Sequence, residues 1–261
     1  MRVAVTWSGG KDSYTAYHWA IEQGHDVACL LTCVYLKPYF FHSFLISELG
    51  AKALGTTQIK FGYIDFGKDF GKAYQNWLDV LARVKREEGL EALVTGDIDS
   101  ADHKQGWDDM CSKLGIELIM PLWDMPPYPG NRYRERVLNM ELSTGMRAII
   151  NCIDLKYFGE EWLGREFDRA CVQDMKALVG PSGVGIDAAG EFGDFHTTVL
   201  DSPLFKEEIE ITKFSKKKAT WSEWGLGDAQ KTMGSQLSGT FLYMDVEEAV
   251  LKPKKSLEPV R

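Results

Sequence analysis

The chain has 261 residues, which is enough for one large domain or two modest ones. Hydrophobic residues make up 44% of the sequence and charged residues 26%, and no apolar run approaches the roughly 20 residues of a membrane-spanning helix, so we expect a globular protein without membrane contact. The formal net charge is −8, with 30 Lys and Arg against 38 Asp and Glu, which argues against nucleic acid as a partner. A basic face around KFSKKKATW (213–221) is the alternative, but short charge runs are more typical of a solvated strand or hairpin.

The five cysteines indicate a reducing environment. They are scattered and odd in number, and none forms a C-x-x-C pair, which argues against a disulfide framework and against structural zinc. The N-terminus lacks the pattern of a signal peptide, because a short apolar run reaches Ser8 and Gly9 at once. Together these features predict a cytoplasmic protein.

The first 36 residues predict a strand, a loop, a helix and a second strand. The β-branched apolar run RVAVTW (2–7) ends at glycines, as buried strands do. Helical spacing extends from Lys11 or Asp12 to about Gln23, and DVACLLTCVY (26–35) predicts the next strand. This order is the βαβ pattern of a parallel sheet.

The same alternation continues to residue 123. Helices are predicted over 41–55, 68–89 and 102–115, and strands over 57–65, 91–98 and 116–123. The stretch DMPPYPGNRY (124–133) then carries three prolines and a glycine, which marks a boundary. We therefore predict an N-terminal α/β domain over residues 1–125.

A second, smaller α/β domain is predicted over 126–235. It would hold a helix near 132–144, a strand over 147–154, a helix after GEEWLG (159–164), a glycine-dense loop over 180–193, and two later strands that begin at 195 and 208. The last residues, 236–261, are predicted to form a frayed tail.

The loop SGGKDS (8–13) has the properties of a phosphate site. Its spacing excludes both the Walker A loop and the G-x-G-x-x-G fingerprint. Adjacent glycines nevertheless allow backbone N–H groups to approach an anion at a helix N-terminus. Lys11 adds a charge, Ser8 and Ser13 add hydroxyls, and Asp12 would either bind Mg²⁺ or cap the helix. The plain alternative is a β-to-α turn without a ligand.

This loop resembles the PP-loop of the N-type ATP pyrophosphatases, which cleave ATP between the α and β phosphates. The resemblance implies an adenine nucleotide α-hydrolase-like parallel sheet flanked by helices. It also implies that Ser8, Gly9, Gly10, Lys11, Asp12 and Ser13 hold the departing pyrophosphate. The adenine of ATP would lie near Leu31 and Thr32, because such folds bind nucleotides at strand C-termini.

Two further stretches, 91–123 and GIDAAGEFGDFHTTVLDSP (185–203), resemble the diphthine–ammonia ligase family. The resemblance implies adenylation of the carboxylate of diphthine on elongation factor 2, followed by displacement of AMP by ammonia. This chain has EFGDFHT where the ligases tend to carry E-G-G-E-[FY]-E-[ST], and His196 there resembles a bacterial-type branch linked to cobalamin-type metabolism. A small-molecule carboxylate is therefore an alternative acceptor. An alternative to the enzyme itself is a non-catalytic module that binds ATP or AMP.

The second motif supplies the remaining candidates for the reaction. Glu191 and Asp194 would orient ammonia or an amine, or bind Mg²⁺, and His196 would take the proton of the attacking amine. A strand-entry turn with solvated acids is the alternative. Gly96 and Asp97 follow a buried strand, which makes them candidates for ATP binding, with Asp97 joining Asp12 as a Mg²⁺ ligand. A homodimer is compatible with a two-lobe enzyme of this size.

Overall fold

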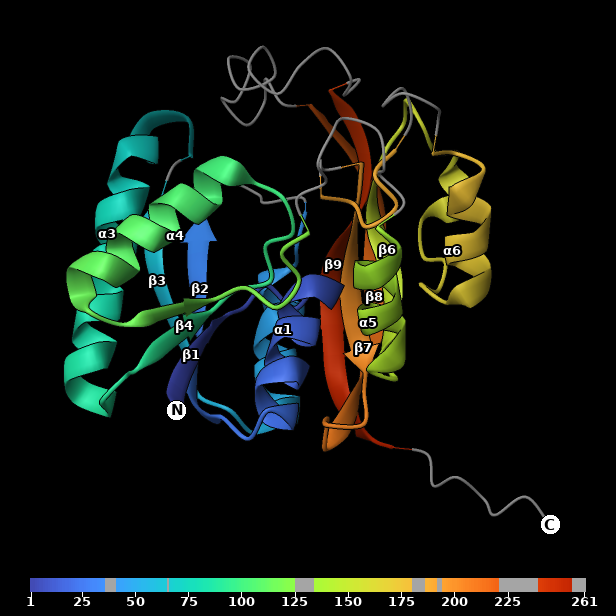
Figure 1. Ribbon diagram of the computed structural model, residues 1–261. Helices are drawn as coiled ribbons and strands as arrows, with labels where there is room; N and C mark the ends of the chain where they lie inside the picture. The colour runs from blue at the N-terminus through green and yellow to red at the C-terminus, as the bar shows by residue number, and fades with distance from the viewer. Residues whose placement is uncertain are drawn as a thin grey trace.

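The computed structural model describes residues 1–35, 41–64, 66–124, 134–179, 186–191, 194–220 and 239–254, while the side chains of 64–71 lie outside this description. The elements form two sheets with helices on and between them (Figure 1). Most of the predicted proline-rich boundary and of the glycine-dense loop falls outside the described residues.

The N-terminal lobe is built on a parallel sheet with strand order β3-β2-β1-β4-β5. Its strands are β1 Arg2–Thr6, β2 Asp26–Tyr35, β3 Gln58–Ile64, β4 Ala92–Val94 and β5 Glu117–Ile119. Its helices are α1 Lys11–Glu22, α2 Phe44–Leu54, α3 Phe66–Glu88 and α4 Ala101–Leu114. Every element predicted for this lobe is present, although β4 and β5 are shorter than expected.

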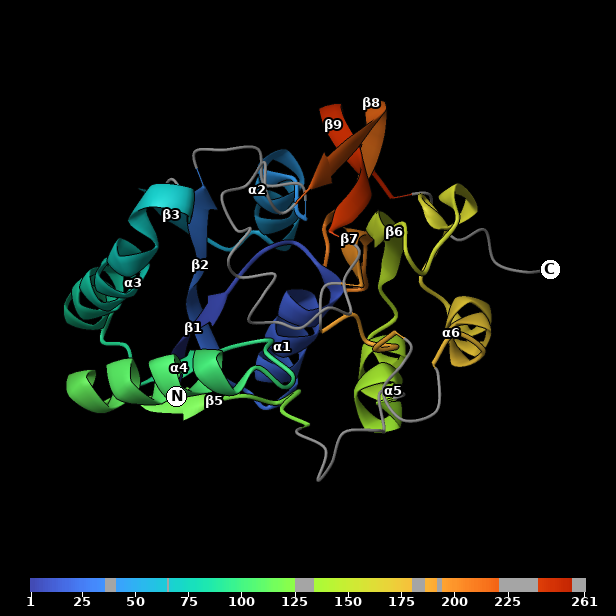
Figure 2. The same ribbon diagram turned by 90° about the horizontal axis from the view of Figure 1, so that it is seen from above.

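Helices cover both faces of this sheet, which explains why its central strands are mainly apolar. Figure 2 shows α3 and α4 on the outer face and α1 and α2 between the two sheets. The central strands β1 and β4 are correspondingly buried on both sides, with Val3, Val5 and Leu93 at 0% exposure. Within the described residues, no helix is long and apolar enough to cross a membrane.

The C-terminal lobe is built on an antiparallel sheet with strand order β7-β6-β9-β8. Its strands are β6 Arg147–Asp154, β7 Phe195–Asp201, β8 Glu207–Thr220 and β9 Thr240–Pro253. Its helices are α5 Glu135–Ser143, the 3₁₀ turn η1 Glu160–Trp162 and α6 Arg169–Lys176. The basic run in 213–220 lies within β8, so the structure confirms the strand and hairpin interpretation of that run.

The prediction of a frayed tail is wrong for residues 240–253. This stretch forms β9, which pairs with both β6 and β8 in the interior of the sheet. The error arose because the charged end of the stretch dominates its composition. Its first residues are apolar, and Phe241, Leu242 and Met244 are buried.

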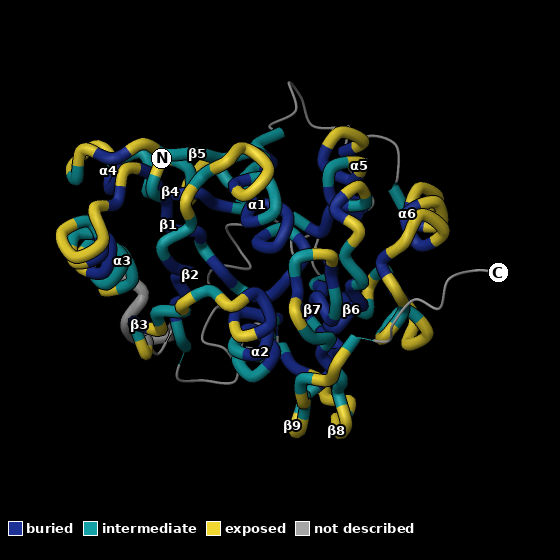
Figure 3. The backbone as a smooth tube through the Cα atoms, turned by 90° about the horizontal axis from the view of Figure 1, so that it is seen from below, coloured by how far each residue is buried: buried dark blue, intermediate teal, exposed yellow. Residues whose placement is uncertain are grey.

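The two lobes share one continuous hydrophobic core. A single cluster of buried side chains runs from Val3 in β1 through Tyr14 in α1 to Ile150 in β6, and Figure 3 shows buried backbone between the lobes. Main-chain hydrogen bonds also cross, from Val199 N–H to the Gly9 carbonyl at 2.9 Å. The predicted phosphate loop is therefore packed directly against the second lobe.

Candidate functional site

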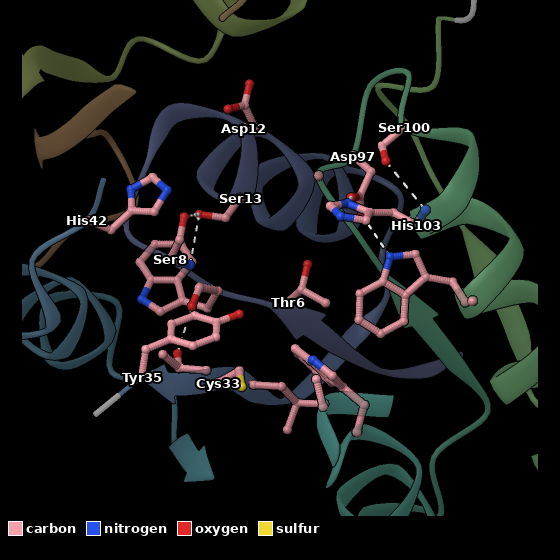
Figure 4. A pocket seen from close by; sticks show the side chains of 18 of the residues that line it. Thr6, Ser8, Asp12, Ser13, Cys33, Tyr35, His42, Asp97, Ser100 and His103 are labelled. Carbon is pink, nitrogen blue, oxygen red and sulfur yellow. Dashed lines mark hydrogen bonds and ion pairs between the residues drawn. The ribbon is translucent and has the colours of Figure 1, made fainter. Parts of the chain in front are cut away.

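A cavity of about 570 Å³ opens at the carboxyl ends of the parallel strands. Figure 4 shows the loop after β1, the end of β2 and the start of α4 arranged around it. The predicted site residues that line it are Ser8, Asp12, Ser13, Leu31, Thr32, Gly96, Asp97 and Glu191. Glu191 comes from the second lobe, so residues of both predicted motifs line one cavity.

Hydrogen bonds of its own serine hydroxyl groups stabilise the loop after β1. Ser13 Oγ accepts a hydrogen bond from the Ser8 N–H at 3.3 Å, and the two hydroxyl oxygens lie 3.2 Å apart. The Gly10 N–H donates to Ser8 Oγ at 3.2 Å. Gly10 is the N-cap residue of α1, and it offers no side-chain cap. Asp12 and Ser13 in the first turn of this helix line the cavity, so the positive end of the helix dipole lies beside it, as an anion site requires.

The glycines of the loop are required by neighbouring backbone. Gly9 has a φ of 84°, and a Cβ there would lie 3.1 Å from Ser47 Cα. A Cβ on Gly96 would lie 2.8 Å from the Asp12 carbonyl carbon and oxygen, so the loops after β1 and β4 are in direct contact. Asp12 and Asp97, which both line the cavity, therefore belong to two loops whose backbones touch.

Both oxygens of Asp97 have partners on α4. Oδ2 accepts from the Trp107 indole N–H at 3.0 Å, and Oδ1 lies 2.9 Å from His103 Nδ1. Burial alone would raise the pKa of Asp97, but these hydrogen bonds and the charge of His103 lower it below its usual value. Asp97 is therefore ionised at the cavity wall and fixes the two aromatic side chains beside it.

Lys11 does not line the cavity. Its ammonium is 2% exposed and points into the second lobe, where Nζ donates to Glu141 Oε1 at 3.0 Å and to the Ala189 carbonyl at 2.6 Å. It also donates to Asp12 Oδ1 at 2.5 Å. Burial would lower the pKa of Lys11, but Asp12 and Glu141 raise it, so the ammonium stays charged.

Glu191 crosses from the second lobe to the start of α4. Its Oε1 accepts the backbone N–H groups of Asp99 at 3.0 Å and Ser100 at 3.1 Å. Burial raises the pKa of Glu191 to about 7, although these hydrogen bonds act in the opposite direction. The side chain thus lines the cavity as a carboxyl group that titrates near neutrality.

The structure places Asp194 and His196 away from the cavity wall. Asp194 is 2% exposed, and its Oδ2 accepts the Asp187 N–H at 2.6 Å within a turn. His196 is stacked against Phe41 with ring centroids 4.2 Å apart, and its Nε2 has no partner among the described residues. Burial lowers the pKa of His196 well below its usual value, so the ring is neutral.

Several residues of the site were missed in the sequence. Arg134 is buried, and it donates to Asp99 Oδ2 at 2.5 Å and to Asp187 Oδ2 at 2.8 Å. Glu141 is fully buried opposite Lys11. Both belong to an ordinary amphipathic helix pattern, in which nothing distinguishes a buried charge from a solvated one.

Asp12 and Asp97, the two carboxylates predicted to bind Mg²⁺ beside the phosphates, both line the cavity. The described residues contain no group of three or more His, Cys, Asp or Glu side chains arranged to hold a metal ion. Mg²⁺ commonly takes one or two protein carboxylates and completes its shell with water and substrate phosphates. The two carboxylates therefore fit Mg²⁺ that arrives with a nucleotide.

The fold and the cavity define a PP-loop nucleotide-binding protein of the α/β class. Residues 1–118 match the family model for the diphthamide synthase N-terminal domain, and residues 135–234 match that for the diphthamide synthase C-terminal domain. The chain therefore belongs to the diphthamide synthase family. Strand β9 lies beyond the matched part of the second domain.

Curated relatives of the chain carry one name, diphthine–ammonia ligase. The Bos taurus protein is 26% identical over 236 residues, and the Homo sapiens protein is 26% identical over 234 residues. Each of these alignments covers 81% of this chain and 83% of the relative. The Schizosaccharomyces pombe protein is 26% identical over 280 residues, covering 100% of this chain and 41% of that longer relative.

Proposed function

We propose that this chain is an ATP-dependent ligase that converts a carboxylate into an amide with ammonia, releasing AMP and pyrophosphate. The observation that carries the proposal is the cavity that Ser8, Asp12 and Ser13 of the SGGKDS loop line together with Asp97 and the second-lobe Glu191. The family and the names of its curated relatives favour diphthine as the carboxylate.

ATP would lie across the carboxyl ends of β1, β2 and β4. The pyrophosphate end would lie on Ser8, Ser13 and the N-terminus of α1, where hydroxyl groups and the helix dipole favour negative charge. The adenine would lie beside Leu31 and Thr32, which line the same cavity. Mg²⁺ held through Asp12 and Asp97 would offset phosphate charge when bound.

The reaction would proceed in two displacements. An oxygen of the acceptor carboxylate attacks the α-phosphorus, the bond to the bridging oxygen breaks, and pyrophosphate leaves. Ammonia then attacks the acyl carbon, AMP leaves, and the nitrogen loses a proton. Glu191 lines the cavity with a pKa of about 7, which suits a group that accepts this proton near neutral pH.

A product assay tests this proposal. Radiolabelled ATP, Mg²⁺ and ammonium are incubated with the chain and with elongation factor 2 that carries diphthine. We expect AMP and pyrophosphate in equal amounts, together with one amide for each AMP. ADP and phosphate would overturn the reaction type. AMP formation that requires a small carboxylic acid and ignores the elongation factor would overturn the assignment of diphthine.

A matched pair of variants locates the reaction in the cavity. Asp12→Asn removes a cavity carboxylate, whereas Glu22→Gln changes an exposed carboxylate at the other end of the same helix. We expect Asp12→Asn to lower AMP formation at least about tenfold, and Glu22→Gln to leave it unchanged. Equal activity of both variants would move the chemistry away from this cavity.

A further inference from the structure

The side chain of Lys11 leaves the phosphate loop and enters the second lobe. Its ammonium lies 5.6 Å from the centroid of the Phe167 ring and 5.9 Å from that of Phe195, both of which belong to the second lobe. Its own backbone N–H is bound to Thr197 Oγ1 at 3.1 Å. Lys11 is thus surrounded by the second lobe although it belongs to the first.

The ammonium of Lys11 has a full set of acceptors. A lysine ammonium offers three N–H donors. Here they meet Asp12 Oδ1 at 2.5 Å, Ala189 O at 2.6 Å and Glu141 Oε1 at 3.0 Å. No donor remains for a phosphate oxygen in this arrangement, and the side chain is too buried for solvent to replace a lost acceptor.

Two of these acceptors belong to segments that form the cavity wall. Asp12 lines the cavity itself. Ala189 is two residues before Glu191, which also lines the cavity and accepts the N–H groups at the start of α4. The third acceptor, Glu141 in α5, is fully buried and anchors the ammonium from the second lobe.

We propose that Lys11 and Glu141 form a clamp between the lobes that positions the carboxylates of Asp12 and Glu191, and that Lys11 does not bind phosphate. The proposal rests on the proposed function, because it assigns both carboxylates to the reaction site. Lys11 and Glu141 are positioning residues, since they act through Asp12 and the Ala189 turn. This replaces the direct role in pyrophosphate binding that the sequence suggested for Lys11.

A double-mutant cycle tests the clamp, with Lys11→Met, Glu141→Met and the two combined. Lys11→Met leaves the buried Glu141 without its partner, and Glu141→Met leaves the buried ammonium with two acceptors in place of three, so we expect both to melt well below the wild type. The combined variant removes both buried charges and should recover most of the lost melting temperature. Glu141→Gln, which keeps an oxygen acceptor of the same length, serves as the conservative control.

Nucleotide affinity and turnover then separate positioning from phosphate binding. For the combined variant we expect ATP affinity, measured by calorimetry, to stay within about threefold of wild type, while kcat for AMP formation falls at least about tenfold. We expect the single variant Glu141→Gln to keep part of the kcat that the combined variant loses. Loss of a charged phosphate contact would instead weaken ATP binding about tenfold to a hundredfold.

Two results would overturn the clamp. A combined variant that binds ATP tenfold or more weakly would show that Lys11 contacts phosphate. A combined variant with wild-type kcat would show that the clamp positions nothing. Calorimetry and melting need no acceptor substrate, so they test the position of Lys11 even if the wild type forms no AMP. Absence of AMP formation would reject only the proposed ligase reaction.

Discussion

Glu191 binds backbone N–H groups of the first lobe through a carboxyl group whose pKa is unusually high. It joins the second lobe to the first turn of α4, and burial raises its pKa from 4.5 to about 7. In the sequence it is one acid in a glycine-rich stretch, and its position there could suggest a site but could not reveal its partners. The backbone N–H groups that it accepts lie more than ninety residues away along the chain.

The pH dependence of stability provides a test of this environment. Because the folded pKa is raised, folded Glu191 holds its proton more tightly than unfolded Glu191 does. Its contribution to stability is therefore fully present below pH 4.5 and is lost as pH rises to about 7. Wild type should lose about 3 kcal/mol relative to Glu191→Gln between pH 4.5 and 7.5.

Urea unfolding of both proteins across this range measures the difference. Other groups titrate in the same window, but they are common to the two proteins and cancel in the comparison. Parallel stability curves for wild type and Glu191→Gln would contradict the raised pKa of Glu191.

At the scale of elements, the start of α1 separates two interpretations of Asp12. The sequence allowed Asp12 either to cap this helix or to face a ligand. The N-cap residue is Gly10, and Asp12 lies in the first turn with its carboxylate on Lys11 and at the cavity wall. The cap of α4 is Ser100, whose hydroxyl accepts a hydrogen bond from the His103 N–H.

Strand β9 yields a prediction about truncation. Deleting residues 240–261 removes the strand between β6 and β8 and exposes the faces that Phe241 and Leu242 cover. We expect this variant to lose cooperative unfolding or to aggregate, because β8 would then have no neighbouring strand in the sheet. Circular dichroism melting and the yield of monomer measure the effect.

A shorter deletion is the matched control for this prediction. Deleting residues 255–261 leaves every described strand intact, so we expect the melting temperature of the full chain. If the chain without β9 melted at the same temperature as this control, the strand would contribute nothing to the fold.

At the scale of the whole molecule, the shared core predicts cooperative unfolding of the two lobes. One buried cluster includes side chains from β1, α1, α2, β6 and α6, and the charged groups of Lys11 and Glu141 cross the same boundary. Separating the lobes would expose this cluster and break the ion pair between Lys11 and Glu141. We therefore expect one transition in calorimetry, with equal calorimetric and van't Hoff enthalpies.

Two resolved calorimetric transitions would contradict this expectation. The Lys11→Met variant can be compared with the wild type in the same experiment. A weakened contact between the lobes should lower the melting temperature of the single transition and leave its two-state character intact.

The order of elements in the N-terminal lobe, the parallel sheet and the phosphate-type loop could all be predicted from the sequence alone. These follow from local rules, since apolar periodicity, glycine turns and helix caps act over a few neighbouring residues. The sequence also selected the acids of the second motif as part of a site. It did not separate Glu191, which reaches the cavity, from Asp194 and His196, which do not.

That separation, the place of β9 and the direction of the Lys11 side chain depend on how the two lobes pack. A residue's chemistry depends on what faces it, and the groups that face Lys11 lie 130 and 178 residues away in the chain. No local pattern carries that information, because burial and charge pairing are fixed only when the two lobes pack together.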